Sequence, residues 1–159
     1  MLNIFIICTG NSCRSVLAEA LFNHLGQGRL NAFSAGSHPV GKINDAALAT
    51  LKRHGLPTEG YQSQSWEDFE EIPMDFVITV CDNAAGETCP VYLTQAVRAH
   101  WGVSDPGHVE GTDEEKTTAF EQTFATLKLR VEKMLELPLE TLHKDKLTAE
   151  LNAIGQLTA

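Results

Sequence analysis

The sequence has few basic side chains and no long apolar run, and these two absences argue against several classes of protein. Lysine and arginine number 12 against 21 acidic residues, so the net charge of −9 does not suit a partner such as nucleic acid or anionic lipid. No apolar run approaches the ~18 residues of a membrane span, and the N-terminus lacks the cationic start of a signal peptide. We therefore expect a cytoplasmic protein with no nucleic-acid and no membrane partner. A small anionic substrate stays open, because local donors and dipoles decide what a pocket binds.

Internal repeats, low-complexity tracts and linkers are also lacking, and 159 residues is the length of one domain. We expect a monomer with a single domain over residues 1–159. Its core should lie at about 1–137, followed by a helical C-terminal extension at about 138–159. In a reducing compartment, the four cysteines are more often catalytic, redox-active or metal-binding than paired in structural disulfides.

Apolar runs typical of buried strands alternate with segments of helical periodicity. Strands are predicted at Leu2–Cys8, Leu30–Ala35, Phe76–Cys81 and Val97–Val103. Helices are predicted at Ser15–Leu25, from Asn44 or Asp45 to His54, from the capping box Thr112–Glu115 to Pro138, and around Leu147–Ile154. This alternation predicts an α/β fold with a parallel sheet.

Three loops that carry reactive side chains follow the first, third and fourth predicted strands, at residues 9–14, 82–89 and 104–107. In parallel sheets, ligands bind beyond the carboxyl ends of the strands, which lie at one edge. We therefore expect these loops to meet there and to form one site.

The loop between the first strand and the first helix has the composition of an anion-binding cradle. Its backbone N–H groups and the following helix N-terminus favour an oxyanion, and Gly10 and Asn11 tolerate the positive φ of a tight turn. Arg14 offers a planar fork for two oxygens of a tetrahedral anion. Cys8 lies at the base of the cradle, so we expect an acidic, nucleophilic thiol whose thiolate accepts a hydrogen bond from the Ser15 hydroxyl. The expected oxyanion-binding residues are Thr9, Gly10, Asn11, Ser12, Cys13 and Arg14.

The CTGNSCRS segment at residues 8–15, the FSAG run at 33–36 and the Asp105-Pro106 pair resemble the low-molecular-weight protein tyrosine phosphatase superfamily. The resemblance covers roughly the first 135 residues. It implies a three-layer α/β fold, with a four-stranded parallel sheet flanked by helices on both faces. It also implies that Asp105 is a general acid, although Ser-Asp-Pro-Gly by itself is an ordinary turn sequence.

Two further cysteines, Cys81 and Cys89, resemble the redox pair of the thioredoxin-coupled arsenate reductases in this superfamily. The resemblance implies that Cys8 attacks arsenate held by the loop and Arg14, while Asp105 protonates the leaving oxygen. Cys81 would then release arsenite by forming a Cys8–Cys81 disulfide, and Cys89 would convert it to a Cys81–Cys89 disulfide for thioredoxin. Phosphate and sulfate would compete with arsenate. No bound cofactor is implied, and glutathione with glutaredoxin is the alternative electron donor.

The same residues leave other functions open. A phosphatase acting on phosphotyrosine or other aryl phosphates needs only Cys8, Arg14 and Asp105, although Gly107 and His108 stand where such phosphatases carry tyrosines. A module that binds oxyanions without catalysis is a third hypothesis. Alternatively, Cys81 could be a packed strand residue and Cys89 a loop thiol without a catalytic role. The cysteine spacing does not fit a zinc site, and no metal ligand is assigned.

Some members of the superfamily bind potassium beside the loop, and Asn11, Glu19 and Ser34 match three of the ligand positions. Gln64 stands at the position of an acidic ligand, which reduces the charge that would attract a cation. We therefore do not predict that site and interpret Glu19 and Ser34 as structural. Cys13 is expected to pack within the loop, and the six histidines are expected to be surface or packing residues.

Overall fold

The computed structural model describes residues 1–82, 86 and 90–159, so the predicted redox residue Cys89 lies outside the described residues. Its centre is a four-stranded parallel sheet in the order β2-β1-β3-β4, which confirms the predicted sheet. The strands are β1 (Leu2–Ile7), β2 (Leu30–Ala35), β3 (Phe76–Thr79) and β4 (Val97–His100). β3 and β4 end earlier than predicted, because the chain turns there into the loops that carry Cys81 and Val103.

The predicted helices are present, with bounds close to those expected. They are α1 (Arg14–Leu25), α2 (Asp45–Arg53), α4 (Asp113–Leu135) and α5 (Lys144–Ile154). Asn44 caps α2 by accepting hydrogen bonds from the N–H groups of Ala46 and Ala47. Thr112 and Glu115 form the predicted capping box of α4, so both helix starts satisfy backbone donors locally. Within the described ranges, no helix has the length and apolar character needed to cross a membrane.

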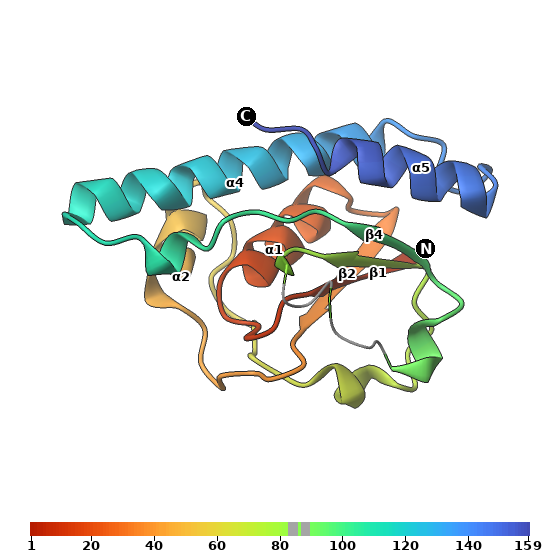
Figure 1. The fold of residues 1–159 in the computed structure, drawn as a ribbon, viewed down its shortest axis with the longest axis horizontal. Helices are drawn as coiled ribbons and strands as arrows, with labels where there is room; N and C mark the ends of the chain where they lie inside the picture. The colour runs from red at the N-terminus through yellow and green to blue at the C-terminus, as the bar shows by residue number, and fades with distance from the viewer. Residues whose placement is uncertain (83–85, 87–89) are drawn as a thin grey trace.

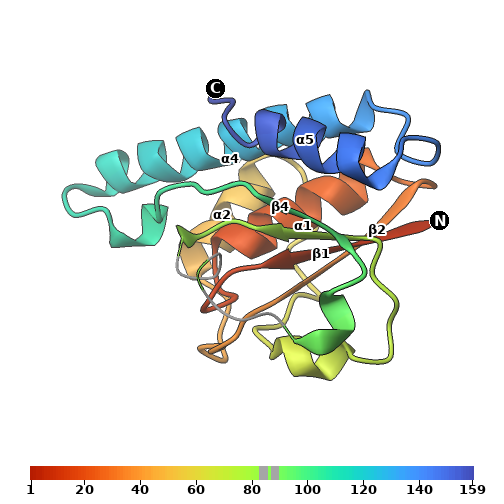
Figure 2. The same ribbon diagram turned by 45° about the vertical axis from the view of Figure 1, so that its right-hand side comes forward.

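Among the described elements, α1, α4 and α5 lie on one face of the sheet, and the 3-10 helices at residues 66–69 and 91–93 lie on the other (Figure 1 and Figure 2). α1, α4 and α5 gather above the sheet in both views, where α1 packs on α4 and α5 packs on both α4 and β4. η1 (Trp66–Phe69) and η2 (Val91–Leu93) lie below it. The predicted three-layer arrangement is confirmed, and in the described chain these 3-10 turns form the second outer layer.

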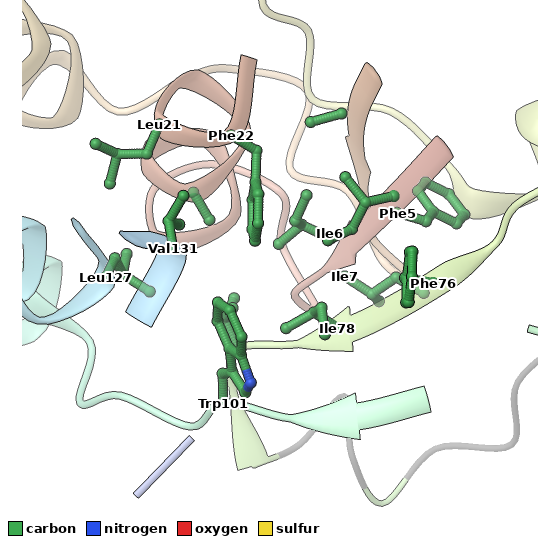
Figure 3. Packing of buried hydrophobic residues seen from close by; sticks show 14 of the residues in the cluster. Phe5, Ile6, Ile7, Leu21, Phe22, Phe76, Ile78, Trp101, Leu127 and Val131 are labelled. Carbon is green, nitrogen blue, oxygen red and sulfur yellow. The ribbon is translucent and has the colours of Figure 1, made fainter. Parts of the chain in front are cut away.

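The central strand β1 is buried on both faces, and residues 4–7 are each 0% exposed. Figure 3 shows Phe22 of α1 facing Trp101, which follows β4, with ring centroids 5.7 Å apart. On the opposite face, Phe5 lies 5.0 Å from Phe69 of η1. Because helices and turns cover both faces, the strand is apolar throughout rather than alternating.

The strand order places a crevice at the carboxyl ends of β1 and β3. β2 lies on one side of β1 and β3 on the other, so the loops after β1 and β3 diverge at this point. Cys8 directly follows β1 and Cys81 follows β3, which brings both thiols to the crevice. Gly36, after β2, passes so close to the loop that a Cβ there would lie 2.3 Å from the Thr9 carbonyl oxygen. A residue with a side chain could not occupy this position without moving the loop.

The C-terminal extension packs on the rest of the chain. Leu147, Leu151 and Ile154 of α5 are buried against α4 and the edge strand β4. Arg29, directly before β2, pairs with Glu140 in the connection that leads to α5, at 2.9 Å. The extension therefore shares the hydrophobic core.

Replacing Leu127 of α4 with alanine tests how strongly the fold depends on the helix layer. Leu127 is 0% exposed, and the cavity left by its side chain should lower the free energy of unfolding by about 2–5 kcal/mol. Urea denaturation measures the loss. The control Lys128→Ala removes an exposed neighbour and should change stability by less than about 0.5 kcal/mol. Equal stabilities of the two variants would contradict the packing of α4 on α1.

Candidate active site

The loop after β1 turns its carbonyl groups away from the crevice. Three of them accept backbone hydrogen bonds from the segment after β2, namely Thr9 from His38 at 3.0 Å, Gly10 from Val40 at 3.1 Å and Ser12 from Asn44 at 2.9 Å. In a trans peptide the following N–H points opposite to the carbonyl, so the N–H groups of residues 10, 11 and 13 point toward the pocket that these residues line. This is the backbone arrangement that the predicted nest of donors requires, and anion binding by these residues stays a prediction.

Asn11 holds this loop in its tight turn. Its φ of 44° is the one positive value at a non-glycine residue in the described part of the chain. Its buried side chain donates to Ser15 Oγ and Ser34 Oγ, each at 2.9 Å, and accepts from the Gln64 N–H at 2.9 Å. These bonds stabilise a left-handed conformation that asparagine tolerates better than most residues. Gly10, the other residue expected to provide a positive φ, does not adopt one.

Arg14 lies across the pocket from the start of α1. Its Nη1 donates to the Val103 carbonyl at 2.9 Å, and its Nη2 lies 3.6 Å from Asp105 Oδ2. Its Nε is buried without a hydrogen-bond partner, the one such side-chain nitrogen or oxygen among the described residues. Leaving a buried donor unpaired is costly, so this nitrogen is available for an oxyanion. The structure thus brings Arg14 and Asp105 together at the loop.

Cys8, Cys13 and Cys81 lie buried at the floor of the site and are 5%, 8% and 4% exposed. The Cys8 thiol is hydrogen-bonded to the Cys81 thiol. Cys81 Sγ also accepts a hydrogen bond from the Thr9 N–H at 3.3 Å and lies 3.5 Å from Thr9 Oγ1. The expected nucleophile and the first of the two expected redox cysteines therefore lie in contact.

The hydrogen bond with Cys81, together with burial, raises the pKa of Cys8. The Arg14 guanidinium and the Gly10 N–H act in the opposite direction and have the smaller effect. This corrects the expectation of an acidic Cys8, which took account of Arg14 and the loop dipoles but not of a second thiol beside the nucleophile. Burial also raises the pKa of Cys13 to about 12, in keeping with a thiol that packs within the loop.

A buried polar network supports the loop from behind. Ser15 Oγ accepts a hydrogen bond from the Asn11 side chain. This bond does not use the hydroxyl hydrogen of Ser15, so the hydrogen bond that we expect from Ser15 to the Cys8 thiolate stays a prediction. Ser34 Oγ donates to Glu19 Oε1 at 2.5 Å, and Gln64 Nε2 lies 3.4 Å from the Ser34 carbonyl. Burial raises the pKa of Glu19 from 4.5 to about 7. The residues that resemble potassium ligands thus connect the loop to α1 and β2.

The loop and Asp105 line a pocket of about 330 Å³. Val40, Asn44 and His108 also line it, and the sequence did not indicate them as site residues. His108 Nε2 lies 3.4 Å from Asp105 Oδ2. The position of His108 close to the Asp105-Pro106 pair was the one feature of the sequence that could have indicated it as a site residue. Val40 and Asn44 reach the pocket through tertiary contacts with the loop, which no local pattern reveals. Within the described ranges, no group of three or more His, Cys, Asp or Glu residues could hold a metal ion.

Residues 3–148 match the family model of the low molecular weight phosphotyrosine protein phosphatases. The chain belongs to this family. A relative named arsenate reductase, from Shouchella clausii (strain KSM-K16), is 34% identical over 137 residues, which covers 84% of this chain and 94% of the relative. A solved structure of an arsenate reductase in the phosphate binding state has a TM-score of 0.69 at 27% identity, over 86% of this chain and 98% of that one.

A low molecular weight protein tyrosine phosphatase from T. tengcongensis also has a TM-score of 0.69, at 19% identity, over 86% of this chain and 99% of that one. The family fold is therefore common to proteins named for two different reactions. Which reaction this family member catalyses depends on the side chains at its site.

Replacing Glu19 with glutamine tests the network behind the loop. Because folding raises the pKa of Glu19, its contribution to stability is complete below its unfolded pKa of 4.5 and is lost as the pH rises through about 7. In potassium-free buffer, the free energy of unfolding of the wild type should therefore fall relative to Glu19→Gln between about pH 5 and 8. Urea denaturation at both pH values measures the difference. The control Glu59→Gln alters an exposed carboxylate, and a slope as large in that variant would contradict the assignment to Glu19.

Proposed function

We propose that this chain reduces arsenate to arsenite by successive thiol steps, with Cys8 as the first nucleophile. The observation that carries the proposal is the buried Cys81 thiol, hydrogen-bonded to Cys8 at the floor of an oxyanion pocket. Hydrolysis of a phosphate ester needs one nucleophile and an acid. A two-electron reduction by thiols instead needs a second sulfur that can attack the first. The family relatives named arsenate reductase support the same substrate.

In the first step, the loop N–H groups and Arg14 hold the arsenate oxygens, and the buried Nε of Arg14 supplies the unpaired donor. The Arg14 guanidinium and the Gly10 N–H, both of which lower the pKa of Cys8, stabilise the Cys8 thiolate that this step requires. Cys8 Sγ attacks arsenic and forms a sulfur–arsenic bond. Asp105, 3.6 Å from Arg14, protonates the leaving oxygen, which departs as water.

In the second step, Cys81 loses its proton to solvent and attacks Cys8 Sγ. The sulfur–arsenic bond breaks and its electron pair stays on arsenic, so arsenic is reduced from As(V) to As(III) and leaves as arsenite. The two sulfurs are oxidised together to a Cys8–Cys81 disulfide. The contact between these thiols means that the step needs no large movement of the strands.

In the third step, Cys89 attacks Cys81 Sγ and returns Cys8 to its thiolate form. This assignment rests on the resemblance of the Cys81–Cys89 pair to that of the thioredoxin-coupled enzymes. The resulting disulfide accepts two electrons from a protein dithiol, and thioredoxin is the donor that we propose. Glutathione with glutaredoxin is the alternative donor.

A phosphatase is the second candidate, because the contact between Arg14 and Asp105 at the loop also suits phosphoryl transfer. It would use Cys8, Arg14 and Asp105 and would not need either further cysteine. Phosphate and arsenate have the same shape and charge, so the ratio of the two activities distinguishes the candidates.

Replacing Cys89 with serine tests the three-thiol relay. With thioredoxin, thioredoxin reductase and NADPH, the wild type should oxidise NADPH continuously when arsenate is added. Cys89→Ser should release one arsenite per molecule and stop, with Cys8 and Cys81 joined in a disulfide that mass spectrometry detects. Sustained turnover of this variant with thioredoxin would contradict the relay. Turnover with glutaredoxin and glutathione only would keep the reductase and remove the assigned role of Cys89.

Replacing Cys81 with serine separates the two candidate reactions. Cys81→Ser should form the arsenic adduct but release no arsenite, because the second nucleophile is missing. It should keep any hydrolysis of aryl phosphate that the wild type has, since that reaction needs only Cys8, Arg14 and Asp105. Arsenite release and aryl phosphate hydrolysis are measured on the same preparations, with Cys8→Ser as the variant that should lose both. Brisk hydrolysis without arsenate reduction by the wild type would identify a phosphatase.

A further inference from the structure

The last residues of the chain lie beyond the family match, which ends at residue 148, and they contact the edge strand β4. Asn152 Oδ1 accepts a hydrogen bond from the His100 N–H at 3.1 Å. Trp101 Nε1 donates to the Leu151 carbonyl at 2.8 Å. An edge strand has backbone groups that no further strand pairs, and here the end of α5 satisfies one of them.

The backbone at Gly155 lies so close to the end of β4 that no side chain fits between them. A Cβ at Gly155 would lie 2.5 Å from the His100 carbonyl oxygen and 2.8 Å from Trp101 Cδ1. Neither atom belongs to a flexible side-chain end, so any larger residue would push the chain terminus away from the strand. The terminal segment is therefore in direct contact with the backbone that leads to the active site.

Arg130 of α4 connects the chain terminus to the same backbone. It is 3% exposed, and no described carboxylate forms an ion pair with it. Its Nε donates to the Leu157 carbonyl at 2.9 Å, and its Nη1 donates to the carbonyls of Trp101 at 2.8 Å and Gly102 at 3.3 Å. Burying a guanidinium without a carboxylate is costly, and burial accordingly lowers the pKa of Arg130. Carbonyl dipoles of three backbone groups hold this charge in place.

Buried Arg130 and half-buried Arg14 bind consecutive carbonyls of one segment. Arg130 binds the carbonyls of Trp101 and Gly102, and Arg14 binds the carbonyl of Val103. The Val103 bond leaves Arg14 Nε as the unpaired donor, and Asp105 lies farther along the same segment. A shift of this backbone would therefore turn the Arg14 fork and move Asp105 together.

We propose that Arg130, bound to Leu157 of the terminal segment, is a positioning residue for the oxyanion site. It fixes the backbone of residues 101–103, so that Arg14 keeps Nε directed at the anion and Asp105 stays beside it. The inference rests on the proposed function only in taking an oxyanion as the ligand, and it applies to anion binding whether or not reduction follows.

The variant Arg130→Lys in the full chain keeps the charge but cannot bridge three carbonyls. Isothermal titration calorimetry with inorganic phosphate and with arsenate should show Kd values raised about tenfold. In an Arg14→Lys background the fork is absent, so the same substitution should change the Kd by less than about twofold. This dependence on Arg14 is the readout that a general loss of stability would not produce.

Leu147→Ala is the control for stability. Leu147 is buried in the same extension but lies at the opposite end of α5 from Leu157. At that end Lys144 contacts the Gln95 carbonyl, which precedes β4. The Leu147→Ala substitution should lower the Tm without changing the Kd for phosphate. Asn152→Ala removes a different hydrogen bond from the terminal segment to the same stretch of backbone, the one to the His100 N–H, and should raise the Kd in the wild-type background only. It decides the matter if Arg130→Lys does not fold.

Three results would overturn the proposal. The first is an unchanged Kd in a folded Arg130→Lys variant, and the second is an equal rise of the Kd in the wild-type and Arg14→Lys backgrounds. The third is a rise of the Kd in Leu147→Ala as large as that in Arg130→Lys. If the lysine variant is unfolded, an unchanged Kd in Asn152→Ala would overturn it as well. A wild type that binds arsenate but does not reduce it would overturn the proposed function and leave the positioning role intact.

Discussion

Backbone hydrogen bonds hold the carbonyls of the loop after β1 away from the crevice, and the site depends on this arrangement. The donors come from residues 38–44, which follow β2, and Gly36 lets that segment pass against the loop. With the carbonyls bonded outward, the planar peptides direct N–H groups inward. The buried side chain of Asn11 then stabilises the left-handed turn that closes the cradle. The anion binding that we propose for this acidic protein therefore depends on local backbone geometry.

The contact between Cys8 and Cys81 changes the chemistry of that cradle. A lone cysteine at the base of an anion-binding loop is expected to be acidic. Here a second buried thiol shares a hydrogen bond with it and raises its pKa. The same contact provides a second sulfur within reach of the first, as a two-electron reduction requires. The feature that makes Cys8 a less acidic thiol is thus the feature that favours a reductase over a phosphatase.

The C-terminal extension gives this family member contacts that lie outside the family match. α5 packs on the edge strand β4, and Arg130 links the Leu157 carbonyl to the backbone after β4. That backbone carries Val103 and Asp105 to the pocket, so the extension and the site both contact one segment of the chain. Packing of a terminal helix can in this way affect a site that it does not touch.

The sequence by itself determined the strands, the helices with their caps, and the CTGNSCRS loop, because each depends on periodicity or chemistry within a few neighbouring residues. These features were sufficient to predict the parallel sheet, the family, and the expected roles of Cys8, Arg14 and Asp105. The sequence led us to expect that the loops carrying Cys8 and Cys81 meet, but only the tertiary structure showed the hydrogen bond from the Thr9 N–H to Cys81, because it depends on β1 and β3 being neighbours. The raised pKa of Cys8 and the unpaired Nε of Arg14 follow from burial and partners, which no local pattern contains.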